Sequence, residues 1–416
     1  MKRYAIIGFG CAGYSAAKAI RTREKEGEIH VFEATREAPA NPMLTTYLAS
    51  GRITDDAAHP FGSNLEQIGR ELGLTVHSGV RVHRVDTARK AVVLKDGKME
   101  FDKLLLATGA QAFCPPLPGL PDRRVMVMRT MADARGLHDY LNSRSVERAV
   151  VVGASMVGIK VAELLWRRGI ETTVADAAPF LFPLAAFENV ARFLEGQVAA
   201  QGVRFLWNAA ARQVLPQGLE LADGTLVKAD LICLCIGTRA NTKLAENEVV
   251  INRGIVVDDH MATSVPGIYA AGDCCEGTEL QSGQTMIIGL WANAKKQGET
   301  AGVNMAGGDA RYEGNILHNI THFMGLDFIG LGDTRRGGRS VSWGDMGRGN
   351  YIQAVLGADG KIQCANILGN LTAAGVLKNH MYKELSGEAN AFGPVEAALL
   401  ERSGVPAAFV RQLGGE

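Results

Sequence analysis

Two glycine-rich turns about 145 residues apart constrain the fold of this chain more than any other feature. They read G-F-G-C-A-G at positions 8–13 and G-A-S-M-V-G at positions 153–158. Each turn follows a run of apolar residues and precedes a segment with the pattern of a helix. Such a turn presents backbone N–H groups and the positive end of a helix to a pyrophosphate. The repetition therefore predicts two nucleotide-binding units and two bound dinucleotides.

An acidic residue closes the second predicted strand of each unit. These residues are Glu33 in the first unit and Asp176 in the second. A carboxylate at this place can accept hydrogen bonds from both ribose hydroxyls of an adenosine. The predicted segments are strands at 4–7 and 29–32 with a helix at 14–21, and strands at 149–152 and 172–175 with a helix at 157–168.

Length and composition exclude several classes of protein. A chain of 416 residues is long enough for two or three domains. The 44 basic and 44 acidic residues balance, so no net charge draws the whole molecule to nucleic acid or to an anionic membrane. Seven scattered cysteines lack the spacing of a disulfide framework, and no apolar run reaches the roughly 18 residues of a membrane span. With the first predicted strand starting at residue 4, which leaves no room for a signal peptide, we expect a cytoplasmic protein.

Further apolar strands end in small residues or in an acid. The strand before Ala107-Thr108-Gly109 and the strand before Gly237 both break at glycine. A later strand delivers Asp273 at its carboxyl end, where ligands of parallel α/β sheets bind. A helix is predicted over 291–306, and from residue 312 the pattern changes to short alternating strands.

Taken together, these residues resemble the two-dinucleotide-binding flavoproteins that use FAD and NAD(P)H. This family includes rubredoxin reductases, the flavin region of nitrite reductase and ferredoxin reductases. The resemblance covers nearly the whole chain and rests on the following marks: the two glycine turns with Glu33 and Asp176, Ala107-Thr108-Gly109, Arg129-Thr130 with Asp133-Ala134, 237–241, 263–273, 291–298 and 365–370.

The resemblance implies an α/β fold with two Rossmann-like three-layer domains and a C-terminal α+β interface domain. The FAD-binding domain would comprise residues 1–115 and 242–310, the inserted NAD-binding domain residues 116–241, and the C-terminal domain residues 311–416. Asp273 would contact the ribityl chain and Trp291 would lie near the isoalloxazine. An acid at Asp176 favours NADH over NADPH, since it would repel a 2′-phosphate.

The family motifs map onto two sets of cofactor-binding residues. The FAD set is Gly8, Gly10, Cys11, Ala12, Gly13, Glu33, Val82, Ala107, Thr108, Gly109, Arg129, Gly272, Asp273 and Trp291. The NAD(H) set is Gly153, Ser155, Met156, Val157, Gly158, Asp176 and Gly237.

The chain departs from the disulfide reductases of this family at the position of the redox cysteine. Those enzymes have a cysteine pair in the first helix or one cysteine in the loop that follows the first nucleotide unit. This chain has Pro42-Met43 in that loop. A thiol relay between flavin and substrate therefore has no carrier, and electrons are expected to leave the flavin directly.

A second departure concerns two candidate catalytic residues. Ferredoxin reductases commonly place a lysine in this loop and pair it with a glutamate just after the second turn. Here the loop has Thr46 and the glutamate position has Lys160. One hypothesis is that the Lys160 charge stabilises reduced, anionic flavin. The alternative is that Lys160 points to solvent or pairs with a carboxylate, and hydride transfer proceeds as in the relatives.

No metal site is expected, although two pairs of residues have suggestive spacing. Cys233 and Cys235 lie in an apolar strand and are expected in the core. His318 and His322 lack a neighbouring third ligand in the sequence. An iron–sulfur centre, if one takes part, must therefore belong to a partner.

A basic turn at 333–339 offers a candidate docking site. Arg335, Arg336 and Arg339 could steer an acidic electron carrier, or the turn could be an ordinary solvated loop. We expect an FAD-dependent NADH oxidoreductase that exchanges electrons with an iron–sulfur or rubredoxin-like protein, as a homodimer or as the NAD-facing subunit of a larger complex. The alternatives are an NADH oxidase or small-molecule reductase, and an NADH-switched interaction flavoprotein similar to apoptosis-inducing factor.

Overall fold

The computed structural model describes residues 1–388 and 391–414. They form two compact units, and each is described by itself. The first comprises residues 1–112, 129–139 and 238–315, and the second comprises 113–128, 140–237 and 316–416. The predicted NAD-binding and C-terminal segments thus fall mostly within one unit, and the exact limits of the three domains stay a prediction.

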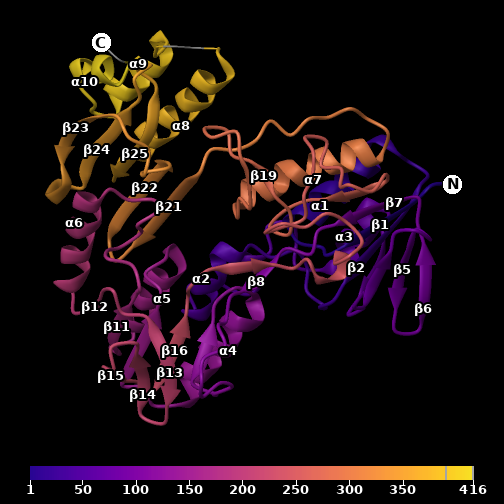
Figure 1. Cartoon of the computed structure of the whole chain (residues 1–416), viewed down its shortest axis with the longest axis horizontal. Helices are drawn as coiled ribbons and strands as arrows, with labels where there is room; N and C mark the ends of the chain where they lie inside the picture. The colour runs from indigo at the N-terminus through magenta and orange to yellow at the C-terminus, as the bar shows by residue number, and fades with distance from the viewer. Residues whose placement is uncertain (389–390, 415–416) are drawn as a thin grey trace. The chain divides into compact units, whose positions relative to one another are not determined.

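A parallel sheet forms the centre of the first unit (Figure 1), in the strand order β18-β7-β1-β2-β3. The side chains of β1, β7 and β18 are mostly buried, as expected for a parallel sheet covered on both faces, whereas those of the edge strand β3 are partly exposed. The strands are β1 (Arg3–Ile7), β2 (Glu28–Glu33), β3 (Thr75–Ser78), β7 (Lys103–Leu106) and β18 (Ile268–Ala270).

Helices α1 (Cys11–Arg23) and α7 (Trp291–Met305) pack side by side in this unit (Figure 1). The close approach depends on glycine, because a Cβ on Gly298 would clash with the carbonyl oxygen of Ala12. The other elements of the unit are η1 (Pro42–Leu44), α2 (Thr45–Ala49), η2 (Asp56–Ala58), α3 (Leu65–Leu72), β4 (Arg84–Asp86), β5 (Ala91–Leu94), β6 (Gly97–Glu100), β8 (Ala110–Ala112), β17 (Thr238–Ala240), η3 (Lys243–Ala245), β19 (Gly277–Thr278) and β20 (Thr285–Met286).

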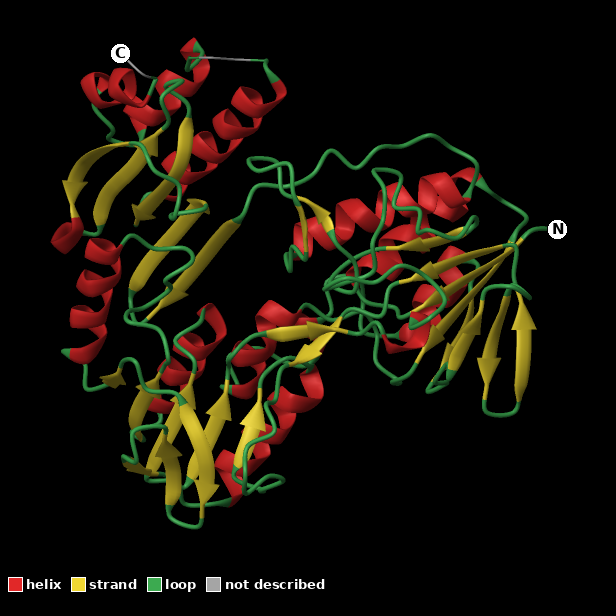
Figure 2. Ribbon diagram, viewed as in Figure 1, coloured by secondary structure: helices red, strands yellow, loops and turns green. Residues whose placement is uncertain are grey.

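The second unit contains a similar parallel sheet, in the order β12-β11-β10-β16-β9 (Figure 2). A small antiparallel sheet, β13-β14-β15, lies against it and shares its core. Helix α4 (Met131–Ser143) belongs to this unit from Tyr140 onward. The remaining elements are β9 (Val125–Val127), β10 (Arg148–Val152), α5 (Met156–Arg167), β11 (Glu171–Ala175), α6 (Glu188–Ala199), β12 (Arg204–Leu206), β13 (Ala211–Leu215), β14 (Gly218–Leu221), β15 (Leu226–Lys228) and β16 (Leu231–Leu234).

An antiparallel sheet with the strand order β21-β22-β25-β24-β23 completes the second unit. Asn366 ties it to the segment before α6, because its buried amide accepts from Phe187 N (2.7 Å) and donates to Ala185 O (2.8 Å). Its elements are β21 (His318–Phe323), β22 (Leu326–Gly332), β23 (Arg339–Asp345), η4 (Met346–Arg348), β24 (Asn350–Leu356), β25 (Ile362–Leu368), α8 (Leu371–Ser386), α9 (Pro394–Arg402) and α10 (Ala407–Leu413). The predicted fold class, two parallel α/β sheets and an α+β tail, is confirmed.

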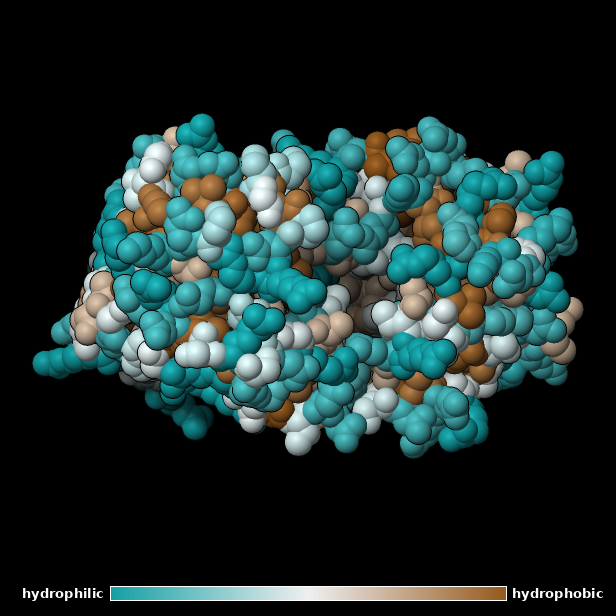
Figure 3. Space-filling view, turned by 90° about the horizontal axis from the view of Figure 1, so that it is seen from below, coloured by the Kyte–Doolittle hydropathy of each residue, from teal (hydrophilic) through white to brown (hydrophobic). Residues whose placement is uncertain are grey.

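One face of the molecule is mainly polar. Figure 3 shows mostly hydrophilic residues on one face, with apolar residues in small separate groups. Among the described residues, no helix combines the length and the apolar character that crossing a membrane requires.

Candidate functional site

The first glycine turn has the geometry of a pyrophosphate cradle. Gly8 has φ +93° and packs so tightly that a Cβ there would clash with Ala107 O, while a Cβ on Gly13 would clash with Gly8 O. In contrast, no described atom lies within 4 Å of a Cβ built on Gly10. The backbone at Gly10 is therefore open to a ligand at the N-terminus of α1. Glu33 faces the same turn, since its Oε2 accepts from Phe9 N at 2.9 Å.

The carboxyl ends of β7 and β18 bring other predicted FAD residues to this edge of the sheet. Thr108 and Asn241 are joined twice, because Thr108 Oγ1 donates to Asn241 O (2.6 Å) and Asn241 Nδ2 donates to Thr108 O (2.9 Å). Asp273 accepts from Arg129 Nη2 at 2.6 Å and is mostly buried. These contacts hold the turn of residues 107–109, Arg129 and Asp273 in one place, and they fit the cradle of an FAD.

Gln297 is a residue of this site that the predicted set does not contain. Its Oε1 accepts from Gly272 N at 2.9 Å, and its Nε2 is buried with no hydrogen-bond partner among the described residues. Gln297 therefore fixes the backbone just before Asp273. The pair Gln297-Gly298 in the sequence is a signal that could have identified it.

An aromatic stack begins at Trp291, the first residue of α7. The Trp291 and Phe61 rings stack with centroids 5.7 Å apart, and the Tyr14 ring stacks on Phe61 at 4.0 Å. Cys11 lies next to it, with its Sγ 3.6 Å from Trp291 O. Burial raises the pKa of Cys11 to about 12, so this thiol remains protonated at neutral pH. Val82, another residue of the predicted FAD set, is buried in the same core.

The second glycine turn repeats the steric plan of the first with one change. Gly153 has φ +103°, and a Cβ there would lie 2.5 Å from Cys235 O. Ser155 stands where the first turn has Gly10. Its Oγ donates to Cys235 O (2.8 Å) and accepts from Gly158 N (3.1 Å), which caps helix α5. Asp176 faces this turn as Glu33 faces the first, because its Oδ2 accepts from Ala154 N at 2.5 Å.

Three more residues of the predicted NAD(H) set lie around this turn. Met156 and Val157 begin α5, and the Val157 side chain is exposed. Gly237 follows β16 with φ +102°, and nothing among the described residues would contact a Cβ there. The turn, Asp176 and the end of β16 thus form a second cradle that fits a dinucleotide.

Lys160 is engaged within its own unit. Its Nζ forms an ion pair with the Glu163 carboxylate and donates to His322 O at 2.7 Å. Glu163 is 2% exposed and also accepts from Arg167 Nη2 (3.0 Å) and Met324 N (3.2 Å). Burial raises the pKa of Glu163, but the bonds from Lys160 and Arg167 outweigh this and hold it below its usual value. The geometry is thus that of a lysine paired with a carboxylate.

Glu163 was missed by the sequence reasoning, although its i,i+3 spacing from Lys160 on a helix was visible. Thr46, the other candidate catalytic residue, lies buried in α2 of the first unit. The loop residues Pro42 to Leu44 form the short helix η1, which leads directly into α2. The catalytic roles of Lys160 and Thr46 stay predictions.

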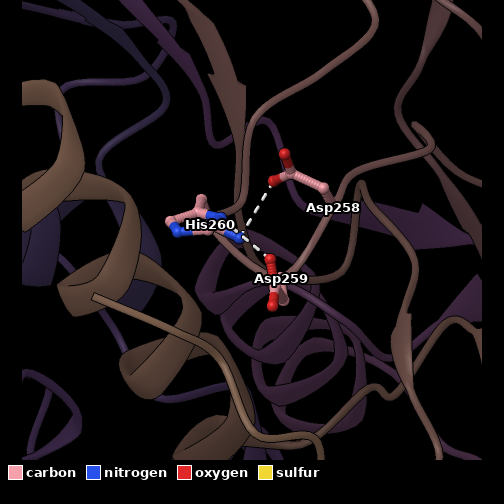
Figure 4. A group of neighbouring side chains, drawn as sticks. All are labelled: Asp258, Asp259 and His260. Carbon is pink, nitrogen blue, oxygen red and sulfur yellow. Dashed lines mark hydrogen bonds and ion pairs between the residues drawn. The ribbon is translucent and has the colours of Figure 1, made fainter. Parts of the chain in front are cut away.

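A group of acidic and histidine side chains lies outside these sites, at Asp258, Asp259 and His260 (Figure 4). His260 Nδ1 lies 2.8 Å from Asp259 and its Nε2 lies 2.8 Å from Asp309. Asp259 is also paired with Arg311 at 2.5 Å. Each of these groups already has a polar partner, which indicates a hydrogen-bonded surface network.

The basic turn joins β22 and β23. Arg335 is bound by Asp333 through both Nε and Nη2, each at 2.8 Å, so its charge is paired locally. Arg336 Nη1 donates to Gln363 at 3.4 Å, and Arg339 is exposed at the start of β23. The predicted docking role therefore depends most on Arg339.

Two parallel α/β sheets, each with a glycine turn and a carboxylate bound to it, are the arrangement expected for a dinucleotide-dependent oxidoreductase. The family model described as pyridine nucleotide-disulphide oxidoreductase matches residues 2–298. The chain belongs to this family, and is an NAD(P)H-dependent oxidoreductase of the FAD-using kind, as its sequence predicts.

Curated relatives differ in their named activities. A nitrite reductase [NAD(P)H] of Bacillus subtilis (strain 168) is 29% identical over 80% of this chain, which spans only 41% of that protein. An NADH oxidase of Methanocaldococcus jannaschii is 29% identical over 80% of this chain and 76% of the relative. A nitric oxide reductase FlRd-NAD(+) reductase of Vibrio vulnificus (strain CMCP6) is 31% identical over 70% of this chain and 77% of the relative. The covalent putidaredoxin reductase–putidaredoxin complex has the same fold, with a TM-score of 0.85 at 22% identity, covering 100% of this chain and 99% of that one.

Proposed function

We propose that this chain is an NADH-dependent FAD reductase that passes electrons to a redox protein, such as an iron–sulfur protein or a rubredoxin-like carrier. One observation carries the proposal. The loop in which disulfide reductases of this family have a cysteine holds Met43 here, and Cys11 near the first turn is a buried, protonated thiol. With no cysteine at this loop position to relay electrons, we expect the acceptor to take them from the flavin itself. The relative named as an FlRd-NAD(+) reductase supports a protein acceptor.

The two cradles support an assignment of the cofactors to particular residues of this chain. Gly8, Gly10 and Gly13 would hold the pyrophosphate of FAD, and Glu33 would accept from its adenosine ribose. Bound FAD supplies the exchange of two electrons with a nicotinamide and of single electrons with a one-electron carrier. Asp273, fixed by Arg129, would orient the ribityl chain.

The second cradle is proposed to select NADH. Asp176 would accept from the ribose hydroxyls of the adenosine and would repel a 2′-phosphate. Ser155 caps α5 without occupying the N–H groups of Met156 and Val157, which would remain available to the pyrophosphate.

We infer that Lys160 is a positioning residue and does not tune the flavin. Its ammonium is balanced by the buried Glu163 carboxylate and by His322 O, which supports a role in fixing α5 to β21. Replacing Lys160 by Gln should then leave the flavin midpoint potential unchanged while lowering stability. A shift in that potential would restore the hypothesis that Lys160 stabilises reduced flavin.

The test is an anaerobic stopped-flow titration of the FAD-loaded protein with NADH. We expect rapid flavin bleaching, followed by reoxidation when a rubredoxin or a plant-type iron–sulfur ferredoxin is added. A parallel assay in air should show turnover with oxygen that is slower than this bleaching. Rapid turnover with oxygen alone would instead favour an NADH oxidase, the activity named for the Methanocaldococcus relative. A slow, long-lived charge-transfer complex with a change of oligomeric state would favour an NADH-switched interaction protein.

The basic turn gives this test a matched pair of variants. Arg339→Glu should slow reoxidation by an acidic carrier, and the loss should shrink as salt rises, because steering between charges is screened. Arg402→Glu, an exposed arginine on α9, is the control and should leave the rate unchanged. Equal effects of the two variants would remove the turn from the docking proposal.

A further inference from the structure

The second unit has a basic pocket that the proposed function does not use. Its volume is about 620 Å³, and its walls include Arg124, Tyr140, Arg144, Arg148, Lys228 and Asp230. Arg148 is the first residue of β10, Asp230 directly precedes β16, and Arg124 directly precedes β9. These strands run parallel, so the pocket lies at the amino-terminal edge of the sheet. The Gly153 turn lies at the opposite, carboxyl-terminal edge.

Two of the charged side chains form the framework of the pocket, since Arg124 is paired with a carboxylate and Asp230 accepts hydrogen bonds from the backbone. Arg124 binds both carboxylate oxygens of Asp122, at 3.1 and 2.7 Å, and donates to Pro216 O (2.7 Å) and Leu215 O (2.8 Å). Asp230 Oδ2 accepts from the backbone N–H groups of residues 147 and 148 at 3.1 and 3.0 Å. Their positions are therefore fixed by contacts within the protein.

The other cationic side chains of the pocket have hydrogen-bond donors that no protein group among the described residues uses. Lys228 and Arg144 are exposed, and among the described residues no carboxylate lies within salt-bridge distance of either. Arg144 instead lies over the Tyr140 ring, 5.1 Å from its centroid. Arg148 Nη2 is 3.9 Å from Asp230 Oδ1, and its buried Nε has no hydrogen-bond partner in the described part of the chain. The pocket thus gathers three cationic side chains with unused donors.

We propose that this pocket binds a compact polyanion of the pyrophosphate class, either free or as the phosphate tail of a nucleoside diphosphate. A volume of about 620 Å³ falls within the usual range for small-molecule sites. Guanidinium groups match phosphate oxygens in two-point contacts, and an ammonium adds a mobile point charge. Arg144 covers the Tyr140 face, so the site recognises phosphate and does not offer a ring for base stacking. The site is separate from the nucleotide cradle, and the proposal is independent of the electron acceptor.

The test is calorimetric titration of the FAD-loaded protein with inorganic pyrophosphate at fixed ionic strength and saturating NAD⁺, which keeps both nucleotide cradles filled. We expect saturable one-to-one binding. The double variant Arg144→Gln/Lys228→Gln should bind about 25-fold more weakly, because each lost charge-assisted contact weakens binding roughly fivefold. The control Arg402→Gln/Arg411→Gln removes two exposed arginines of α9 and α10 and should bind like the wild type.

Two further measurements distinguish a nucleotide from free pyrophosphate as the ligand, and loss of binding from loss of folding. ADP binding more tightly than pyrophosphate would identify a nucleotide tail, whereas equal affinities would identify the pyrophosphate group alone. The pocket variant should retain wild-type affinity for NAD⁺, which shows that its sheet is folded. No saturable binding to the NAD⁺-saturated wild type, or equal weakening in the control variant, would overturn the proposal.

Discussion

Replacing Glu163 by Gln should destabilise the second unit more than any surface change on α5. The Glu163 side chain is 2% exposed and the partner Lys160 side chain is 11% exposed, so the ion pair is shielded from water. Glutamine could still accept from Arg167 and Met324, but its NH₂ group cannot accept from the Lys160 ammonium. Removing one partner of a buried ion pair typically costs about 3–5 kcal/mol. Because Lys160 keeps its bond to His322 O, we expect about 3 kcal/mol, the lower end of that range.

A double-mutant cycle isolates this pair. Lys160→Gln/Glu163→Gln removes both charges, so it should be less destabilised than the sum of the single variants by about 2 kcal/mol. Arg167→Gln is the control, since its side chain is 46% exposed and its pair with Glu163 should contribute about 0.5 kcal/mol. Urea unfolding gives the free energies. Hydrogen exchange followed by mass spectrometry should show faster exchange in α5 and β21, the two elements that the pair connects.

The same pair predicts how stability depends on pH. The pKa of Glu163 lies below its usual value in the folded protein. The ionised Glu163 therefore contributes fully to the free energy of unfolding above the carboxyl pKa of the unfolded chain, about 4.3. This contribution is lost as the pH falls through the lower pKa of the folded protein. Glu163→Gln should make the free energy of unfolding depend less on pH in this acid range, the acid limb of the stability curve. Additive single variants, unchanged exchange in α5 and an unaltered acid limb would together refute the structural role of the pair.

Three other changes test the cradles and the core. Asp176→Arg should lower kcat/KM for NADH and raise it for NADPH, which shifts the ratio of the two values by roughly 100-fold in steady-state assays. An unchanged ratio would exclude Asp176 from the ribose site. Asn366→Ala should cost about 1–3 kcal/mol in urea unfolding, because it leaves the partly buried Phe187 N without its acceptor. A smaller loss would mean that water replaces the amide. The added methyl group of Gly298→Ala should clash with Ala12 O and destabilise the first unit by about 1–3 kcal/mol. It should also weaken FAD retention, measured by flavin release on heating. Normal retention would show that α1 and α7 can move apart without loss of FAD binding.

Much of the fold could be predicted from local patterns. The strand predicted at 4–7 is β1 (Arg3–Ile7), and the helix predicted over 291–306 is α7 (Trp291–Met305). Such elements carry continuous apolar runs or a helical period, and their ends are marked by glycine. The positions of the two cradles could also be predicted from the sequence, because each cradle is built from one glycine turn and one acidic residue about 20 residues apart.

The features that the sequence did not reveal join distant segments. Lys160 reaches His322 O across 162 positions, and nothing near either residue marks the other as a partner. The basic pocket likewise draws Arg124, Arg148 and Lys228 from the ends of strands in two sheets, which become neighbours only when the unit folds. Pairing of this kind depends on strand order, which local periodicity does not encode.

Helix α5 links the nucleotide cradle of the second unit to its C-terminal sheet. Its first residues follow the Ser155 cap and face the predicted pyrophosphate position. Lys160, about one turn further on, binds His322 O, and Glu163, about two turns further on, binds Met324 N at the end of β21. A helix of this length is stiff, because every interior backbone group is bonded to its neighbour one turn away. A displacement of β21 would therefore move the turn that holds the nucleotide. This mechanical link explains the position of the Lys160–Glu163 pair, because the pair holds the cradle in place and adds no net charge to it.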